Sequence, residues 1–339
     1  MSGGITQLVA IGAQDAWLTG KPEVSFFRNN YKRHTNFAHV VQRQVIQGAV
    51  NRAGMSSIRL ERRGDMVSYV YLTKKNSSGE QIAFDNTDID HVDILIGGQV
   101  IDSQDNTFMR NIADAFLSST QNKTSFSTTY GDFFYPLRFW FCENWQSALP
   151  LIALQYHDVE IRIYWSSSVT VTDIFEAWAN FIVLDVVERE DFASRTQNHL
   201  VYQVQKALPS GNKMQNLVFN HPIKFLACSE IANNKIDTLL LQINGVDIGE
   251  PKTITPNFDY VPNFYTVPYN NGGIEQILIP FCLDTSKLQP TGTLNFSRID
   301  SARLISTTNF TTALIGTLYA VNYNILKIEN GMGGLMYAN

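Results

Sequence analysis

One alternating segment of this chain occurs twice, and this repetition restricts the fold more than any other feature of the sequence. Residues 89–98 carry apolar side chains at every second position and end in a Gly-Gly dipeptide, and residues 236–245 follow the same pattern and end in Asn-Gly. Alternation with period two is typical of β-strands, and both dipeptides suit a two-residue hairpin turn that requires positive φ angles. The sequence therefore predicts the same β-hairpin at two places in the chain.

Two further pairs of segments repeat in the same order. Residues 141–159 match residues 281–299 at a constant displacement, and residues 181–183 match residues 321–323 more weakly. We interpret the chain as two copies of one β module, separated by a change in loop length. The second copy has no counterpart of His157. This difference indicates that the aromatic stretch before His157 is architecture rather than a reactive centre.

The rest of the chain is also dominated by short alternating runs. Turn residues separate these runs, and no regular succession of helices lies between them, which argues against a parallel nucleotide-binding sheet. We expect one helix over residues 106–117, with Asn106 as its N-cap and Phe108 and Phe116 on its apolar stripe. Many short strands with frequent turns are typical of sandwiches or barrels. The predicted class is all-β with few short helices.

The composition excludes several classes of function. The chain has 31 acidic and 26 basic residues, a net charge of −5, which argues against a protein that holds nucleic acid mainly through its phosphates. The three cysteines, Cys142, Cys228 and Cys282, are far apart and form no CxxC pair, so we expect neither a disulfide framework nor a zinc site. No apolar run approaches the roughly 20 residues that cross a bilayer.

Long blocks of the sequence occur in the order typical of one known family. They include Gln-Leu-Val-Ala from Gln7, Pro-Leu-Arg-Phe-Trp-Phe-Cys from Pro136, Phe-Asn-His-Pro from Phe219 and Gly-Met-Gly-Gly-Leu from Gly331. With these blocks the chain resembles the double jelly-roll major capsid proteins of large icosahedral DNA viruses of eukaryotes, of the algal-virus and giant-virus type. The resemblance extends from one end of the chain to the other.

The resemblance implies a fold of two consecutive eight-stranded antiparallel jelly rolls. Its expected parts are an N-terminal arm (1–23), a first roll (24–190), a linker (191–202) and a second roll with a C-terminal tail (203–339). It implies a structural role without catalysis, in which three chains form a trimer of pseudo-hexagonal outline that tiles the icosahedral shell of a virion. The implied partners are further copies of the chain, neighbouring capsomers, minor capsid proteins and an inner membrane beneath the shell, without direct contact to nucleic acid.

The chain departs from the family pattern in its loops. Residues 144–147, Asn-Trp-Gln-Ser, stand where relatives usually carry a small turn containing glycine, and the interstrand loops are short, so the outward towers should be small. A minor capsid paralogue of the same fold is therefore one alternative. A carbohydrate-binding β-sandwich protein is a more distant alternative, because jelly rolls often serve as lectins.

Some residues have the chemistry of a reactive or binding site. Cys142, His157 and Asp158 could form a hydrolase triad, but we favour a buried histidine whose neighbours satisfy it, because the second copy has Ser-Arg in place of His-Asp. The basic turn around His34 could bind phosphate, but we favour a solvated or interface-paired turn because the chain is acidic. No helix directly follows the first Gly-Gly dipeptide, which favours a hairpin over a phosphate loop.

The remaining candidates are acidic residues and asparagines. Glu188, Glu190 and Asp191 could bind a cation, but the ordinary charge of a linker explains them better. We therefore predict no catalytic, cofactor-binding or metal-binding residues and no cofactor. Asn76 and Asn122 each precede Ser or Thr by two residues and are the candidate glycosylation sites.

Overall fold

The protein divides into two compact units, Met1–Asn36 and Phe37–Asn339. In the first unit, a short helix, α2 (Ala16–Thr19), precedes a segment in which Phe26 and Phe27 are almost fully exposed. The computed structural model describes residues 4, 16–29, 31–85, 87–118, 132–228, 237–268, 276–311 and 316–337.

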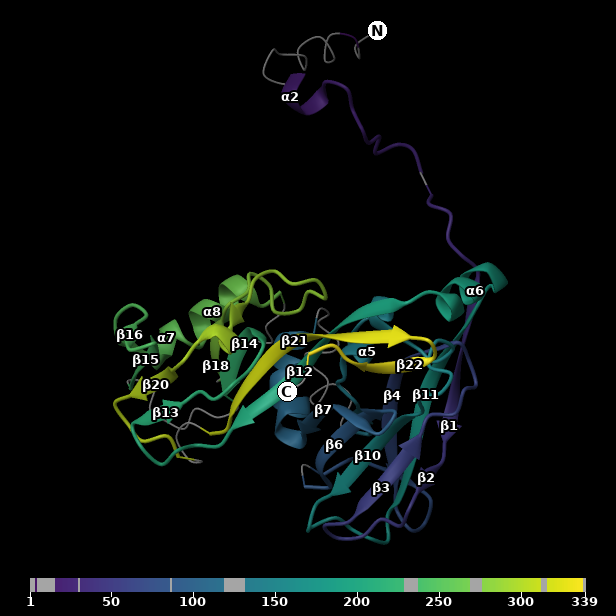
Figure 1. Ribbon diagram of the computed structural model, residues 1–339, viewed down its shortest axis with the longest axis horizontal. Helices are drawn as coiled ribbons and strands as arrows, with labels where there is room; N and C mark the ends of the chain where they lie inside the picture. The colour runs from purple at the N-terminus through teal and green to yellow at the C-terminus, as the bar shows by residue number, and fades with distance from the viewer. Residues whose placement is uncertain are drawn as a thin grey trace. The chain divides into compact units, whose positions relative to one another are not determined.

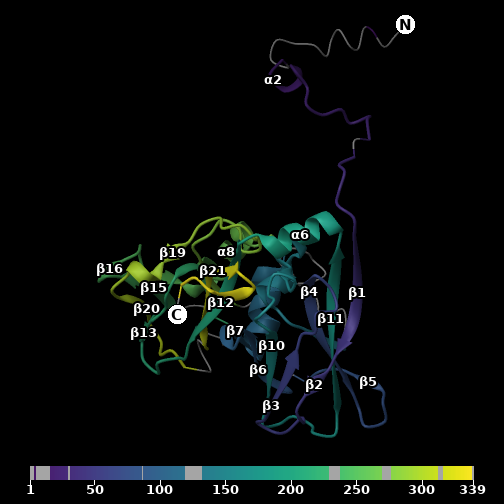
Figure 2. The same ribbon diagram turned by 45° about the vertical axis from the view of Figure 1, so that its right-hand side comes forward.

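The second unit begins with a sandwich of two antiparallel sheets (Figure 1). The six-stranded sheet contains β1 (Phe37–Gln44), β4 (Met66–Lys75), β5 (Gln81–Ile82), β8 (Phe134–Pro136), β9 (Leu149–Pro150) and β11 (Ile174–Leu184). The five-stranded sheet contains β2 (Ile46–Gln47), β3 (Met55–Arg59), β6 (Ile89–Ile96), β7 (Gln99–Asp105) and β10 (Val159–Trp165). In Figure 2 the long strands β1 and β11 run side by side along the first sheet, as their pairing requires.

A second sandwich of the same construction follows. Its six-stranded sheet contains β12 (Gln197–Ala207), β14 (Pro222–Cys228), β18 (Ile277–Pro280), β19 (Leu294–Asn295), β21 (Leu318–Glu329) and β22 (Met332–Leu335). Its five-stranded sheet contains β13 (Met214–Asn216), β15 (Thr238–Ile243), β16 (Val246–Asp247), β17 (Lys252–Thr253) and β20 (Ala302–Ser306).

The two sandwiches have corresponding strand orders. The order β1-β11-β4 in the first sandwich corresponds to β12-β21-β14 in the second, and β3-β10-β6-β7 corresponds to β13-β20-β15-β16. Two facing antiparallel sheets connected in this way are the arrangement of a jelly roll. The predicted fold of two consecutive jelly rolls is therefore confirmed.

The predicted twin hairpins are confirmed in detail. The first pairs Ile96 with Gln99 across the Gly-Gly dipeptide, whose φ angles are 58° and 84°. The second pairs Ile243 with Val246 across Asn-Gly, with φ angles of 49° and 79°. Only glycine and, less often, asparagine adopt positive φ without strain, so these dipeptides close both turns for the same physical reason.

The register of the weaker repeat differs from the prediction. Strands β4 and β14 each carry a bulge, and the last pair before it joins Tyr69 to Asn180 in one roll and Phe225 to Val321 in the other. Asn180 therefore corresponds to Val321, and the predicted match of Phe181 with Val321 is wrong by one residue. Strand β21 is buried on both faces over most of its length, so its apolar pattern does not distinguish the two registers.

The helices are few and short, as predicted. They are the π-helix η1 (Phe108–Leu117), α5 (Trp140–Glu143), η2 (Trp145–Ser147), α6 (Val186–Ser194), α7 (Ile254–Asn257), α8 (Tyr260–Thr266) and η3 (Phe296–Arg298). The helix expected over residues 106–117 is confirmed, but its expected cap is wrong. The side chain of Asp105 accepts the hydrogen bond from the Phe108 N–H at 2.8 Å, whereas the Asn106 amide oxygen accepts one from the Tyr135 hydroxyl.

The segment between the rolls is short and partly helical. Residues 191–202, the expected linker, include the end of α6 and the first residues of β12, which pairs with β21 along its whole length. Figure 2 shows α6 at the end of β11. The domain boundaries as a whole, 1–23, 24–190, 191–202 and 203–339, stay a prediction.

Candidate functional site

The two rolls meet in one continuous apolar cluster. Tyr319 and Phe225 of the second roll belong to the same buried cluster as the core of the first roll, while a separate cluster fills the second roll itself. The helix η1 of the first roll packs Phe108 against Tyr319 at 5.7 Å and Phe116 against Phe225 at 5.8 Å between ring centroids. Aromatic pairs of this kind contribute about 0.5–1.5 kcal/mol beyond their buried area. The second roll is thus held to the first by core-like packing.

Hydrogen bonds across this joint fix the direction of the second roll. The Tyr202 hydroxyl on β12 donates to the Arg138 carbonyl at 2.6 Å, and the Val204 N–H donates to Asp102 at 2.9 Å. The Tyr319 hydroxyl donates to the Asp105 carboxylate at 3.0 Å. Buried hydrogen bonds are directional and costly to leave unmade. They therefore oppose sliding of β12 along β7.

Arg138 is a buried cation of the first roll, and its backbone carbonyl accepts the hydrogen bond from Tyr202 of the second roll. Its side chain is only 5% exposed, and its guanidinium lies 2.7 Å from Asp114 and 2.7 Å from Glu143. It also donates to the Ser118 hydroxyl and the Ala113 carbonyl. Burial lowers the pKa of this guanidinium, but Glu143 and Asp114 outweigh that effect and raise it. Burial also raises the pKa of Asp114 to about 6, although Arg138 acts against it. The cation thus links η1 to α5, which contacts β12.

Asp102 is the titratable group at the same joint. Burial raises its pKa to about 7, although the Val204 N–H and the Gln104 amide donate to its carboxylate and lower it. A raised pKa means that the folded chain keeps a proton which the unfolded chain has already lost. Below the ordinary pKa of 3.8 the group is protonated in both states and does not lower the free energy of unfolding. As the pH rises from 3.8 to about 7, the free energy of unfolding falls.

We expect Asp102→Asn to stabilise the protein above pH 7 and to leave its stability almost unchanged near pH 4. The gain should be about 2 kcal/mol. Linkage at about 1.4 kcal/mol per unit of pKa shift would give a larger gain, but asparagine keeps only part of the carboxylate's hydrogen bonds. Urea denaturation at pH 4.5, 6 and 8 measures the difference. The exposed Asp247→Asn is the control, and an equal effect of Asp102→Asn at all three pH values would contradict the assignment.

The C-terminal hairpin anchors the second roll to the first at another place. In Figure 1, β21 runs across to the first roll and turns back as β22. The Tyr156 N–H donates to the Gly331 carbonyl at 2.9 Å, and Nδ1 of His157 lies 2.9 Å from the Gly333 carbonyl oxygen. A Cβ atom on Gly333 would lie 2.6 Å from the Leu154 side chain, so this glycine permits close packing.

His157 and Asp158 contact other partners than a Cys-His-Asp triad would require. His157 contacts the backbone of Gly333, and Asp158 pairs with Arg59. His157 also lies directly over the first hairpin, where a Cβ on Gly97 would meet its imidazole. The interpretation of His157 as a satisfied architectural residue agrees with these contacts, but the side chain is half-buried rather than buried.

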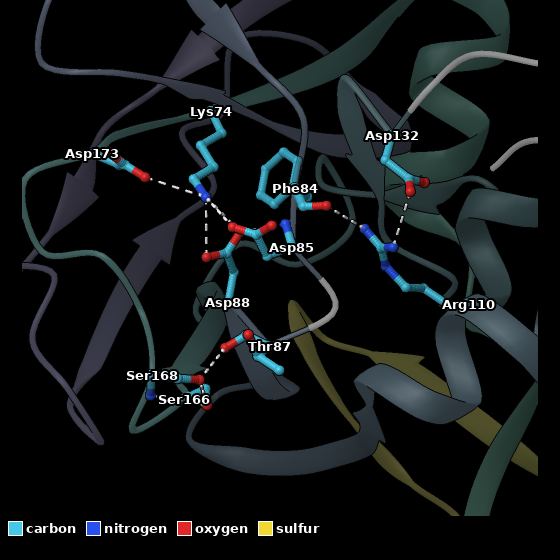
Figure 3. A network of polar contacts seen from close by, with 10 residues as sticks. All are labelled: Lys74, Phe84, Asp85, Thr87, Asp88, Arg110, Asp132, Ser166, Ser168 and Asp173. Atoms are coloured by element: carbon cyan, nitrogen blue, oxygen red, sulfur yellow. Dashed lines mark hydrogen bonds and ion pairs between the residues drawn. The ribbon is translucent and has the colours of Figure 1, made fainter. Parts of the chain in front are cut away.

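A second buried cation, Lys74, was not predicted. Its side chain is 1% exposed, and its ammonium lies 2.9 Å from Asp88, 3.2 Å from Asp173 and 3.1 Å from the exposed Asp85 (Figure 3). Burial lowers the pKa of Lys74, but hydrogen bonds to Asp88 and Asp85 outweigh that effect and raise it. The ammonium therefore stays charged and joins two loops at one end of the first roll.

The neighbourhood of Lys74 contains a second polar group of contacts. Arg110 of η1 pairs with Asp132 at 3.3 Å, and the Ser168 hydroxyl donates to the Thr87 carbonyl at 3.1 Å (Figure 3).

The signal for Lys74 was present in the sequence. Val70 and Leu72 point into the core from β4, and alternation places Lys74 on the same face. A lysine at a core position requires buried carboxylates.

The other sequence candidates take part in different contacts. Asp191 forms an ion pair with Arg195 at 2.6 Å on the surface of α6, and Glu188 and Glu190 belong to the same short helix. In the N-terminal unit, His34 contacts the Thr35 carbonyl and is exposed. Among the described residues, no group of three or more His, Cys, Asp or Glu side chains could hold a metal ion. No helix in the described part of the chain is long and apolar enough to span a membrane.

The two glycosylation candidates remain untested predictions. The Asn76 side chain accepts hydrogen bonds from the Ser78 and Glu80 N–H groups, and its amide nitrogen donates to the Glu80 carboxylate at 2.9 Å. Attachment of a glycan to this nitrogen would replace the last of these bonds. Asn122 lies outside the described residues.

Comparisons with known proteins agree along the whole chain. The family model described as "Major capsid protein N-terminus" matches residues 25–203, and the one described as "Large eukaryotic DNA virus major capsid protein" matches residues 258–334. The chain is 32% identical over 404 aligned residues to the major capsid protein of Pyramimonas orientalis virus. It is 31% identical over 444 aligned residues to that of Paramecium bursaria Chlorella virus 1. Both alignments cover all of this chain and all of the relative.

Solved structures extend the likeness to the fold. The PBCV-1 virus capsid structure superposes with a TM-score of 0.77 and 26% identity, covering 93% of this chain and 100% of that chain. The Faustovirus major capsid protein superposes with a TM-score of 0.63 and 10% identity, covering 94% of each chain, and supports the fold alone. The likeness therefore includes both rolls.

Proposed function

The chain belongs to the family of large eukaryotic DNA virus major capsid proteins, and from this membership we propose that it is a capsid subunit that associates with copies of itself into trimeric capsomers of a virion shell. The observation that carries this proposal is the full-length match to major capsid proteins, which includes both rolls. A trimer of two-roll chains presents six similar flanks, so one subunit shape suits hexagonal packing.

The joint between the rolls supports this role in physical terms. A capsomer with six similar flanks requires a constant angle between the two rolls of each chain. Core-like packing, the hydrogen bond from Tyr202 to the Arg138 carbonyl and the docked C-terminal hairpin all restrict that angle. Close-packed protein interiors are stiff and change shape in discrete steps rather than continuously. The joint is therefore the functional site in a mechanical sense.

We propose further that the protein turns over no substrate and binds no cofactor. Its residues with reactive chemistry, such as His157 and Asp158, are engaged in contacts that hold the fold together. Minor capsid proteins and an inner membrane are proposed as further partners, and the net charge of −5 disfavours direct binding of nucleic acid.

The length of the alignments bears on the outward loops. The alignment to the Pyramimonas orientalis virus protein runs over 404 residues, although this chain has 339, so the relative contains residues that have no counterpart here. We propose that these extra residues lie in the interstrand loops, which would give this subunit small outward towers. The principal shell subunit is the proposed role, with a minor capsid paralogue as the alternative.

The mass of the purified protein in solution tests the proposal. We expect sedimentation equilibrium at micromolar concentration to give a stable species of three times the 38.2 kDa of the chain. Stable interfaces of this kind bury more than roughly 1,000 Å². A protein that stays monomeric under these conditions would overturn the proposed function.

Deletion of residues 1–20 tests the role of the N-terminal arm. The compact unit that holds the first roll begins at Phe37, and the deleted segment exposes the large apolar side chain of Trp17. We expect the shortened chain to fold and to trimerise but to form shells poorly, because this exposed indole would be missing from contacts between capsomers. Circular dichroism, sedimentation and electron microscopy of assembled particles measure the three properties. An unfolded product would contradict this prediction.

A further inference from the structure

The first roll exposes an aromatic face on its six-stranded sheet. Val70 and Leu72 of β4 point into the core, so Tyr69 and Tyr71 point away from it. Tyr69 is 40% exposed, and Trp178 of the neighbouring β11 pairs directly with Tyr71 in the strand register. We call Tyr69, Tyr71 and Trp178 the outer face. Exposed aromatic groups of this kind mark interaction surfaces.

The corresponding face of the second roll is covered within the chain. The bulge register equates Tyr69 with Phe225 and Trp178 with Tyr319, because each pair occupies the same place relative to the bulge. Phe225 and Tyr319 are almost fully buried, and η1 of the first roll covers them with Phe116 and Phe108. One roll therefore shows what covers this face, whereas among the described residues of the other roll Phe134 packs on Tyr71 and Tyr69 stays exposed.

The second roll carries the counterpart of the covering helix. In the first roll, η1 follows the hairpin of β6 and β7, and in the second roll α7 and α8 follow the hairpin of β15 and β16. The helix α8 exposes Tyr260, Phe264 and Tyr265, with Phe264 at 80% and Tyr265 at 75%. The rings of Phe264 and Tyr265 meet edge to face at 5.0 Å. Figure 1 shows α8 on the second roll and β4 and β11 on the first.

We propose that α8 of one copy packs on the outer face of the first roll of the next copy, as η1 packs on the second roll within the chain. The proposal rests on the proposed capsid function and names the surfaces by which the copies associate. Each chain has one α8 and one outer face, so the contact is head to tail. Such contacts form closed rings when the rotation between copies permits closure. Three two-roll chains then alternate within-chain and between-chain joints.

Removal of the α8 aromatics is the first test. We expect Phe264→Ser/Tyr265→Ser to weaken association about 100-fold or more, as the loss of two interface aromatics does elsewhere. Sedimentation at micromolar concentration should then give monomers, while circular dichroism stays that of the wild type because both side chains are exposed. The control is Leu208→Ser/Val218→Ser, which removes two equally exposed apolar side chains from the second roll and should leave the trimer intact.

A complementation experiment tests the pairing of the two surfaces. Tyr69→Glu removes the outer face and should also give monomers, with Tyr69→Ser as the substitute if the glutamate variant unfolds. An equimolar mixture of the Tyr69 variant with the α8 variant retains one intact contact, between α8 of the first and the outer face of the second. We expect a one-to-one dimer in native mass spectrometry, which neither variant forms alone.

The outcomes separate this inference from the proposed function. A wild-type monomer would overturn the proposed function and with it the inference. A wild-type trimer together with a trimeric α8 variant would overturn the inference alone. Monomeric variants that do not combine in the mixture would also overturn it, because a head-to-tail contact requires that they do.

Discussion

Replacing Arg138 with methionine is expected to lower the free energy of unfolding by about 3–5 kcal/mol at pH 7. Methionine occupies a similar volume, so the loss comes chiefly from charge. Asp114 and Glu143 would remain buried without their cation, and the Ser118 hydroxyl and Ala113 carbonyl would lose a donor. Breaking a buried ion pair from one side is costly because the other side stays desolvated.

Urea denaturation followed by tryptophan fluorescence measures this effect. The matched control is Arg195→Met, which breaks the exposed ion pair with Asp191 on α6 and should cost less than about 1 kcal/mol. Equal losses in the two variants would show that the buried ion pairs of Arg138 stabilise the fold no more than an exposed pair does. Because Arg138 holds η1 and α5 together, hydrogen exchange should also rise in β12, which packs on both rolls.

Replacing Lys74 with methionine is expected to cost a similar amount, about 3–5 kcal/mol at pH 7. The ammonium is the cation that Asp88 and Asp173 share, and both carboxylates are largely buried. Without it they would repel each other in a medium of low dielectric constant.

A compensated variant makes the Lys74 prediction specific. Adding Asp88→Asn and Asp173→Asn to Lys74→Met removes the uncompensated charges and should restore at least half of the lost stability, because neutral buried groups carry a much smaller desolvation penalty. The surface variant Lys327→Met, which breaks an exposed pair with Glu329, is the control. If the triple variant were as unstable as Lys74→Met alone, the loss would reflect packing and not charge.

Local features of the fold could be predicted from the sequence because they depend on neighbouring residues. The Gly-Gly and Asn-Gly dipeptides require positive φ angles wherever they lie, and the alternation beside them defines strands without reference to the rest of the chain. The helix over residues 108–117 follows in the same way from its apolar stripe. Its cap does not follow from the sequence, because Asp105 and Asn106 are both good capping residues and only the geometry selects Asp105.

The register of the β21 repeat could not be obtained in this way. In β21, Ala320 packs into the second roll and Val321 packs against the first, so both faces are apolar. A strand with two apolar faces has no period-two pattern that distinguishes its inside from its outside. The second apolar face exists only because the first roll covers it, which is a fact of tertiary packing.

The sequence by itself determined the two β modules, their hairpins and the family resemblance, since these depend on turn chemistry, alternation and the order of sequence blocks along the chain. Only the tertiary structure decided the joint. It brings Arg138 to Tyr202, Asp105 to Tyr319 and His157 to Gly333, pairs that are distant in the sequence. The physical reason is that a buried charge or an aromatic ring has no local preference for its partner. Its partner is selected when the two sheets pack and water is excluded from both.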